Sequence, residues 1–365
     1  MKPIYIVSWL FALAVSFVSC DDWLDKTLKD RLYPDVYFKT EDELRLFTNQ
    51  FYNNLVPSAV DIYSESSDLI VKSDLMLEMS GQRIIPDEGN GWNFTALRDI
   101  NFYLQYSHNC TEVNARNRYD GVARFFRAYF YFEKVKRYGD IPWYDKALDS
   151  DDPELYKARD SREFVMQKML EDLDFAIANL PKTKNAYVLT RWTALALKSR
   201  VCLFEGTFRK YHGLEDCEKY LNACVSASET FMNESGYTLY KSGSTPYRDL
   251  FASINLQADE VIFGRDYEAS LSVLHNVQNY ENSTTMGRPG MNKKIVNSYL
   301  MADGSRFTDK AGYETMTFDQ ECQNRDPRLA QTIRTPGYTR IGSTKKEAPN
   351  LAYTMTGYHL IKYSM

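Results

Sequence analysis

The sequence predicts a mainly α-helical protein, in which helix pairs of the tetratricopeptide type form a scaffold that carries long irregular loops and a few short strands. Two observations predict this class. Four amphipathic segments with helix start and stop signals follow one another between about 116 and 232. Beyond 235, short apolar stretches alternate with Gly, Ser, Pro and Asn. The sequence does not repeat regularly at the 34-residue period of true tetratricopeptide repeats. The predicted class therefore depends on the pairing of the helices.

Composition is that of a globular protein with an unusual aromatic content. The chain has 365 residues, 44% of them hydrophobic and 25% charged, which is enough to bury a sizeable core. The net charge is −5 and no basic stripe occurs, which argues against nucleic acid as a partner. The chain contains 27 Tyr, 20 Phe and 5 Trp, and we expect most of these rings to fill helix interfaces.

The first 19 residues are predicted to be a lipoprotein signal peptide. The apolar run from Ile4 to Val18 would span roughly 22 Å as a helix, short of the ~30 Å hydrocarbon core of a bilayer. Cleavage before Cys20 is therefore expected, with Cys20 as the lipidation site. Residues 20–39 would then form a polar, lipidated tether.

A single domain is expected over 40–365, with a helical scaffold at about 40–235. Thr40 and Glu43 form a capping box at the start of the first helix. Its apolar face consists of Leu44, Phe47, Phe51 and Leu55. A long loop region follows over 56–93.

Five further helices complete the predicted scaffold. They are expected within 94–108, 120–144, 160–181, 190–213 and 215–232. Gly139 and Pro142 end the second of these helices. Asp160 and Glu163 predict a second capping box at the start of the third.

The remainder, about 236–365, is expected to be rich in loops and strands and to face the ligand. Short strands are predicted at "YTLY", "DEVIFGRDY" and "YHLIKY", and one helix near 291–300.

Motifs for catalysis or for cofactors are missing from the sequence. The four histidines form no H-E-x-x-H, and neither a P-loop nor G-x-S-x-G occurs, so we expect no metal and no cofactor. The acidic "DSDDPE" (149–154) is interpreted as a solvated loop rather than a calcium site. Carboxylates are numerous, so composition alone leaves a glycosidase pair open.

Aromatic and amide residues on loops are the remaining candidates for a binding site. They are Arg83, Trp92 and Asn93 before the second helix, Arg265 and Tyr267 in "GRDYE", and Asn279 and Tyr280 in "NVQNYEN". A flat ring beside amide and guanidinium donors suits a sugar, because the ring covers the apolar face and the donors bind hydroxyls. The spacing alone leaves open that these residues anchor loops.

Eight segments occur in a characteristic order. They are "SCDDWLDK" near the start, "YFKTEDEL" (37–44), "LRDINFYL" (97–104), "ARFFRAYFYFEKVKRYGDIPWY" (123–144), "LALKSRVCLFEGTFRKYH" (195–212), "EVIFGRDY" (260–267), "NRDPRL" (324–329) and "GYHLIKY" (357–363). Together they resemble the SusD/RagB outer-membrane lipoproteins of Bacteroidetes.

The resemblance implies a cell-surface lipoprotein of the outer membrane that is not an enzyme. It implies capture of oligosaccharides for a SusC-like TonB-dependent transporter, with the scaffold helices docked on that transporter. The acids after Cys20 resemble the family's surface-export signal. The expected ligand-binding residues are Arg83, Trp92, Asn93, Tyr267 and Tyr280. The alternatives are peptide capture, as in RagB-like proteins, and a surface glycoside hydrolase.

One departure concerns the C-terminal region. Family members usually continue into a further helix pair with an arginine-tyrosine-alanine-glutamate type motif, whereas this sequence stops at "KYSM". We therefore expect a truncated or frame-shifted member of the family, whose apolar helix faces lack partners and which folds poorly alone.

Overall fold

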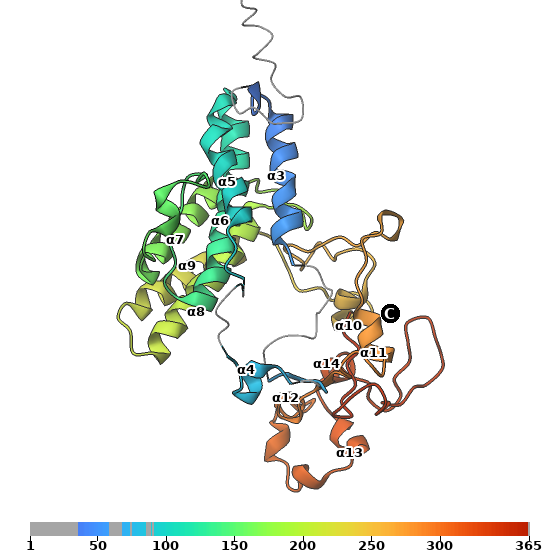
Figure 1. Ribbon diagram of the computed structural model, residues 1–365. Helices are drawn as coiled ribbons and strands as arrows, with labels where there is room; N and C mark the ends of the chain where they lie inside the picture. The colour runs from blue at the N-terminus through green and yellow to red at the C-terminus, as the bar shows by residue number, and fades with distance from the viewer. Residues whose placement is uncertain (1–35, 58–67, 74, 85–88, 90, 364–365) are drawn as a thin grey trace, which may run out of the picture.

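The computed structural model describes residues 36–57, 68–73, 75–84, 89 and 91–363. Long helices form one side of the molecule, and short helices and loops from the C-terminal part form the other (Figure 1). The predicted signal peptide, Cys20 and most of the tether lie outside the described residues. In the part that is described, no helix is long and apolar enough to cross a bilayer.

Among the described residues, six long helices build the scaffold, in agreement with the predicted mainly α-helical class. They are α3 (Glu41–Leu55), α5 (Thr95–Tyr106), α6 (Val113–Tyr138), α7 (Arg162–Asn179), α8 (Arg191–Tyr211) and α9 (Cys217–Glu234). Helix α6 packs along α7 and α8 packs along α9, while α3 and α5 both lie against α6 (Figure 1).

The core of the scaffold is built from aromatic rings. Phe38 is fully buried, and its ring centroid lies 5.5 Å from that of Tyr103 and 5.0 Å from that of Phe47. Phe51 of α3 meets Phe126 of α6 edge to face at 6.1 Å. The expectation that most aromatic residues fill helix interfaces holds for these rings, since edge-to-face packing is their preferred geometry.

The first predicted capping box is present and the second prediction is wrong. The Thr40 hydroxyl accepts from the Glu43 amide at 3.3 Å, and the Glu43 carboxylate accepts from the Thr40 amide at 3.1 Å. Helix α7 is instead capped by Ser161, whose hydroxyl accepts from the Phe164 amide. Asp160 is unavailable as a cap because its carboxylate accepts from the Trp143 amide at 2.7 Å.

The three predicted strands are also wrong. The strands in the described residues are β1 (Ile70–Val71) and β2 (Gly290–Met291), which pair antiparallel. The stretch 237–240 bonds instead to the backbone and side chains of the 259–260 turn. The stretch 358–363 forms only isolated bridges, so neither stretch has the continuous partner that a ladder requires.

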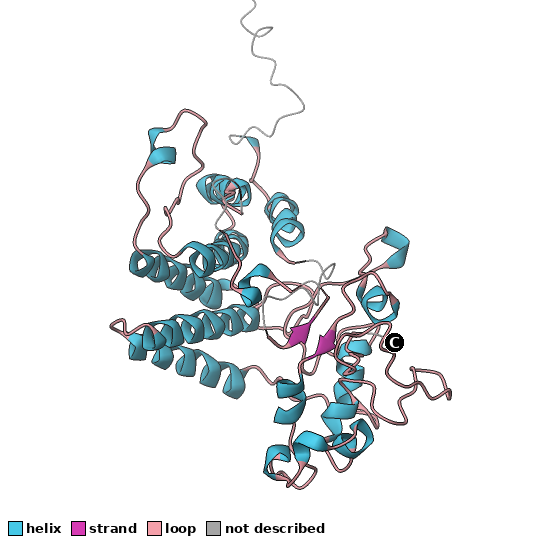
Figure 2. Ribbon diagram, turned by 60° about the horizontal axis from the view of Figure 1, so that its bottom comes forward, coloured by secondary structure: helices cyan, strands magenta, loops and turns pink. Residues whose placement is uncertain are grey.

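The C-terminal part has its own apolar cluster. Short helices surround it: α10 (Pro246–Ala252), α11 (Val277–Asn282), α12 (Lys293–Ser298), α13 (Phe318–Cys322) and α14 (Pro327–Ala330). Helix α12 is the helix predicted near 291–300. The β1–β2 pair lies between the long helices and the short C-terminal helices (Figure 2), and the short α4 (Leu77–Ser80) follows β1. This pairing joins the segment before α5 to the C-terminal part of the chain.

The cluster consists of Val277, Tyr280, Met291, Val296, Leu329, Ile333, Tyr358 and Leu360.

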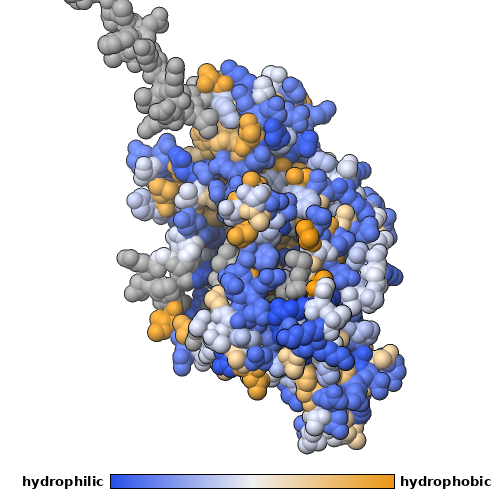
Figure 3. All heavy atoms as spheres, turned by 90° about the vertical axis from the view of Figure 1, so that its right-hand side faces the viewer, coloured by the Kyte–Doolittle hydropathy of each residue, from blue (hydrophilic) through white to orange (hydrophobic). Residues whose placement is uncertain are grey.

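On the face shown in Figure 3, apolar residues lie scattered over a mostly hydrophilic surface.

Candidate ligand-binding site

The loop before α5 presents Trp92 on a tight turn. Gly91 has a φ of 84°, a conformation that glycine adopts without strain, and the Trp92 amide donates to the Gly89 carbonyl at 3.0 Å. The Lys134 ammonium of α6 donates to the Gly91 carbonyl. The Asn93 side chain accepts from the Thr95 amide at 2.8 Å at the start of α5. Helices α5 and α6 therefore both fix the position of Trp92.

The indole of Trp92 is 40% exposed and rests on an aromatic base. Its ring meets Tyr138 edge to face at 5.0 Å and Phe94 at 5.3 Å. The Arg159 guanidinium lies 4.9 Å from the indole centroid, within the range of a cation–π contact. This is a supported, partly open aromatic surface.

A hollow of about 600 Å³ opens beside the indole, and we call it the Trp92 hollow. Helix α5 contributes one wall, and the chain between Pro142 and Arg159 contributes the other. It is lined by Trp92, Phe94, Thr95, Leu97, Arg98, Asn101, Pro142, Tyr144, Lys146, Leu148, Leu155, Lys157, Ala158 and Arg159. This volume and the mixture of rings with polar groups suit a small organic ligand.

A buried polar chain connects the two walls. The fully buried Asn101 donates to the Tyr144 carbonyl at 2.8 Å and to the Lys146 carbonyl at 3.2 Å, and its oxygen accepts from Arg127. Arg127 in turn binds Asp172 of α7 through two bonds of 2.6 and 2.7 Å. The loop that forms the second wall is thus tied to the scaffold core.

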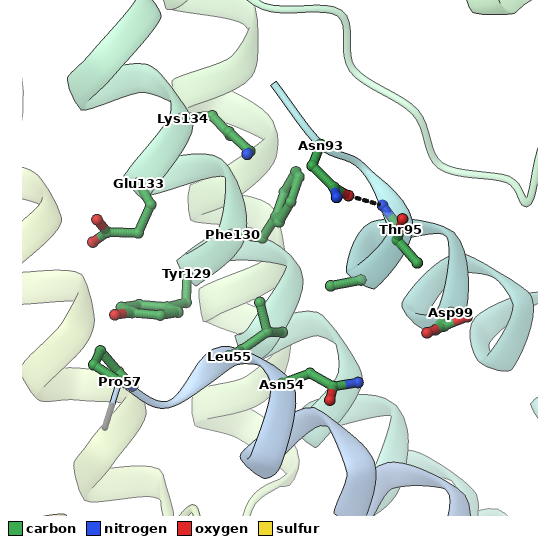
Figure 4. Close-up of a pocket in the computed structure, with 11 residues that line it drawn as sticks. Asn54, Leu55, Pro57, Asn93, Thr95, Asp99, Tyr129, Phe130, Glu133 and Lys134 are labelled. Atoms are coloured by element: carbon green, nitrogen blue, oxygen red, sulfur yellow. Dashed lines mark hydrogen bonds between the residues drawn. The ribbon is translucent and has the colours of Figure 1, made fainter. Parts of the chain in front are cut away.

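A second hollow of about 620 Å³ borders the same loop at Asn93, and we call it the Asn93 hollow (Figure 4). It is lined by Asn54, Leu55, Pro57, Asn93, Thr95, Ala96, Asp99, Tyr129, Phe130, Glu133 and Lys134. Burial raises the pKa of the Asp99 carboxyl and lowers the pKa of the Lys134 ammonium. Thr95, the first residue of α5, lines both hollows, so the two hollows are adjacent.

The structure brings two of the five predicted ligand-binding residues together. Trp92 and Asn93 line the two adjacent hollows, whereas Arg83 is exposed beyond α4 and lines neither. Tyr267 packs edge to face with His275 at 4.8 Å. Tyr280 is only 5% exposed and belongs to the C-terminal apolar cluster, so it is a core side chain here.

Sequence reasoning missed the basic residues of the Trp92 hollow. Arg98, Lys146, Lys157 and Arg159 all line it. Lys146 precedes the acidic stretch 149–154, and Lys157 and Arg159 follow it. These bases on both sides of the acids in "DKALDSDDPELYKAR" were the available signal.

Comparison with known proteins places the chain in a family. Residues 80–191 match a family model described as starch-binding associating with outer membrane, and residues 250–365 match the model of the SusD family. The two matches together cover more than half of the chain, and the chain belongs to the SusD/RagB family. The resemblance carried by the eight segments is thereby confirmed, and SusD-like proteins are a carbohydrate-binding family.

Individual relatives are distant. A SusD-like protein of Formosa agariphila is 25% identical over 294 residues, covering 75% of this chain and 55% of its own length. The chain spans about half the length of the curated relatives that it matches.

Solved structures show the same fold. A SusD-like protein of Bacteroides fragilis has a TM-score of 0.72 at 20% identity, with 90% of this chain and 69% of that chain covered. A structure with a xylogluco-oligosaccharide has a TM-score of 0.57 at 17% identity, with 88% and 61% covered.

Proposed function

We propose that this protein captures oligosaccharides at the cell surface, in the Trp92 hollow, and passes them to a SusC-like TonB-dependent transporter. The observation that carries the proposal is the supported, 40% exposed indole of Trp92 beside a hollow of about 600 Å³. Two comparisons support a saccharide as the ligand. One matching family model is described as starch-binding, and one structure of the same fold was solved with a xylogluco-oligosaccharide.

The chemistry of the hollow suits a sugar. The partly exposed indole of Trp92 offers apolar surface to the C–H groups of a pyranose ring. The side chains of Arg98, Lys146 and Arg159 offer donors to its oxygens. A hollow that combines rings with a few polar groups gives both affinity and orientation.

We propose binding rather than hydrolysis as the role of this site. Glycoside hydrolysis generally needs two carboxyl groups that flank the scissile bond. Among the described residues that line the Trp92 hollow, none carries a carboxyl group. In the Asn93 hollow, Asp99 and Glu133 lie on opposite sides with Phe130 and Leu55 between them (Figure 4), and Glu133 pairs with Lys136 at 2.7 Å.

The attachment to the membrane is a proposal from the sequence. We propose that Cys20 carries the lipid, that residues 20–39 form the tether, and that the ligand-binding domain begins at residue 40. The family model described as associating with outer membrane supports this location. Surface exposure and the transporter partner follow from the same resemblance.

Substitution of Trp92 tests the proposed function. In affinity electrophoresis against a panel of plant and algal polysaccharides, we expect the protein to be retarded by one class. Trp92→Ala should weaken that binding about fivefold or more, because loss of aromatic stacking typically costs ~1 kcal/mol.

Tyr211→Ala is the matched control, because Tyr211 is an 81% exposed aromatic residue that lines neither hollow. Unchanged affinity in Trp92→Ala would mean that the indole only anchors its loop. Retention of peptide mixtures, with no response to any polysaccharide, would replace the glycan assignment by peptide capture.

A further inference from the structure

We infer that the saccharide bound in the Trp92 hollow is anionic, with a carboxylate or sulfate group held by Arg98 and Arg159. This inference rests on the proposed function and narrows its substrate class. It starts from the charge of the lining: four basic residues, and no acidic residue among those described. The whole chain has a net charge of −5, so the basic lining of the hollow is a local feature and does not reflect a general excess of bases.

The hydrogen-bonding capacity of the lining is unbalanced in the same direction. Lysine and arginine only donate, and the one amide, Asn101, already uses its oxygen to accept from Arg127. The hydroxyls of Thr95 and Tyr144 are left as the lining side-chain groups that can accept from a sugar hydroxyl. A neutral sugar presents hydroxyl donors as well as acceptors, whereas a carboxylate or sulfate presents acceptors only. The lining therefore matches an anionic substituent better than a neutral ring alone.

The existing ion pairs leave these cations available. Arg98 meets Asp149 at 3.6 Å with both side chains largely exposed, and Lys146 meets Glu154 at 2.8 Å at the surface. Exposed pairs of this kind contribute little free energy, so a bound anion can compete with them. Within the described part of the chain, Arg159 has no ion pair at all.

The position of Arg159 over the indole suggests how the site works. Its guanidinium lies 4.9 Å from the centroid of Trp92, so the cation and the aromatic surface are neighbours. A planar guanidinium can give two parallel hydrogen bonds to a carboxylate or sulfate. A saccharide ring that packs on the indole can thus place its charged substituent against Arg159.

The second arginine is fixed in place by the loop. The Arg98 Nε donates to the Leu148 carbonyl at 3.1 Å, and its Nη2 lies 3.6 Å from the Asp149 carboxylate. On the opposite wall, the Lys157 ammonium bonds to the Trp143 carbonyl at 2.7 Å and to Asp160 at 2.9 Å. The walls therefore hold positive charge in fixed positions.

Paired saccharides test the inference with the full chain. Isothermal titration would compare an oligouronate with its carboxyl-reduced form, and a sulfated oligosaccharide with its desulfated form. We expect one charged member to bind at least about tenfold more tightly than its neutral counterpart, as charge-assisted hydrogen bonds require. Raising the salt concentration should narrow that gap.

Two variants assign the effect to the arginines. Arg159→Gln and Arg98→Gln should each weaken binding of the charged saccharide about tenfold. Binding of the neutral counterpart should weaken by a clearly smaller factor, so the affinity gap between the two saccharides should narrow. Lys210→Gln is the charge-matched control, because Lys210 is exposed near the end of α8 and lines neither hollow. It should leave both affinities unchanged.

The outcomes separate this inference from the proposed function. Equal binding of charged and neutral partners, with both lost in Trp92→Ala, would overturn the anionic class and leave saccharide capture standing. Binding of the neutral saccharides alone would also overturn the anionic class and leave saccharide capture standing. Failure of every saccharide to bind would overturn both. Equal losses in Lys210→Gln and Arg159→Gln would show a nonspecific charge effect and would also overturn the inference.

Discussion

At the scale of single residues, one buried ion pair links the scaffold to the candidate ligand site. Arg127 and Asp172 are both buried, and Arg127 also donates to the oxygen of Asn101. Asn101 in turn donates to two carbonyls of the loop that forms the second wall of the Trp92 hollow. Burial opposes the charge of Arg127, but the bond to Asp172 keeps the pKa of the guanidinium above its ordinary value. Breaking such a pair is costly, because it leaves one charge buried without compensation.

We predict that Asp172→Ala lowers the free energy of unfolding by about 3–5 kcal/mol. The control is Asp174→Ala on the same helix, which removes an ion pair between the largely exposed Asp174 and Lys198. That control should cost at most about 1 kcal/mol. Urea denaturation of both variants measures the difference, and comparable losses would refute the role given to Asp172.

At the scale of elements, the β1–β2 pair depends on a glycine. Gly290 of β2 pairs with Val71 and also bridges to His359. A Cβ atom at Gly290 would overlap the hydroxyls of Thr354 and Thr356 and come within 3.1 Å of the Thr356 amide nitrogen. Strand β2 can therefore approach the C-terminal loop only without a side chain.

Gly290→Ala should destabilise the protein by about 1–3 kcal/mol, the usual cost of overpacking. Gly121→Ala is the comparison, because a Cβ at this helical position meets its nearest atoms, in Leu180, at an ordinary 3.4 Å. That variant should be neutral, or more stable by up to about 1 kcal/mol, through helix propensity. Thermal unfolding of the two variants in parallel reports both effects, and a Gly290→Ala protein with unchanged stability would contradict the prediction.

At the scale of the whole molecule, we expect one buried histidine to make the free energy of unfolding depend on pH. His359 is 1% exposed, and the neutral ring protonated at Nε2 satisfies both contacts, donating to the Glu281 carbonyl at 2.9 Å and accepting from the Asn350 amide at 3.5 Å. Burial, and then the charge of Arg334, lower its pKa from 6.5 to about 4. The folded state therefore takes up a proton less readily than the unfolded state.

The depressed pKa of His359 makes the protein less stable in acid. Its contribution to the free energy of unfolding is complete above about pH 6.5 and is lost as the pH falls toward about 4. The total loss in unfolding free energy is roughly 3 kcal/mol. Unfolding free energies measured between pH 7.5 and 4.5 should decline, and His359→Gln should flatten that decline even if it is less stable throughout. An equal slope in wild type and variant would exclude His359 as the cause.

Much of the fold could be predicted from the sequence. The six long helices, the capping box at Thr40 and the stop at Gly139 all follow from residues within one or two turns of each other. The predicted strands failed because strand formation depends on a partner that is distant in the chain. The predicted cap at Asp160 failed for the same reason, since Trp143 occupies its carboxylate.

For the candidate ligand site, the helical scaffold and the placement of Trp92 on a glycine-bounded loop followed from the sequence alone, because both are local properties. The tertiary structure alone decided that Tyr280 lies in a core and that Arg98, Lys146, Lys157 and Arg159 line one hollow with Trp92. Burial and charge clustering arise from contacts between segments far apart in the chain. A loop with more acids than bases can therefore place its basic side chains in the lining of a hollow.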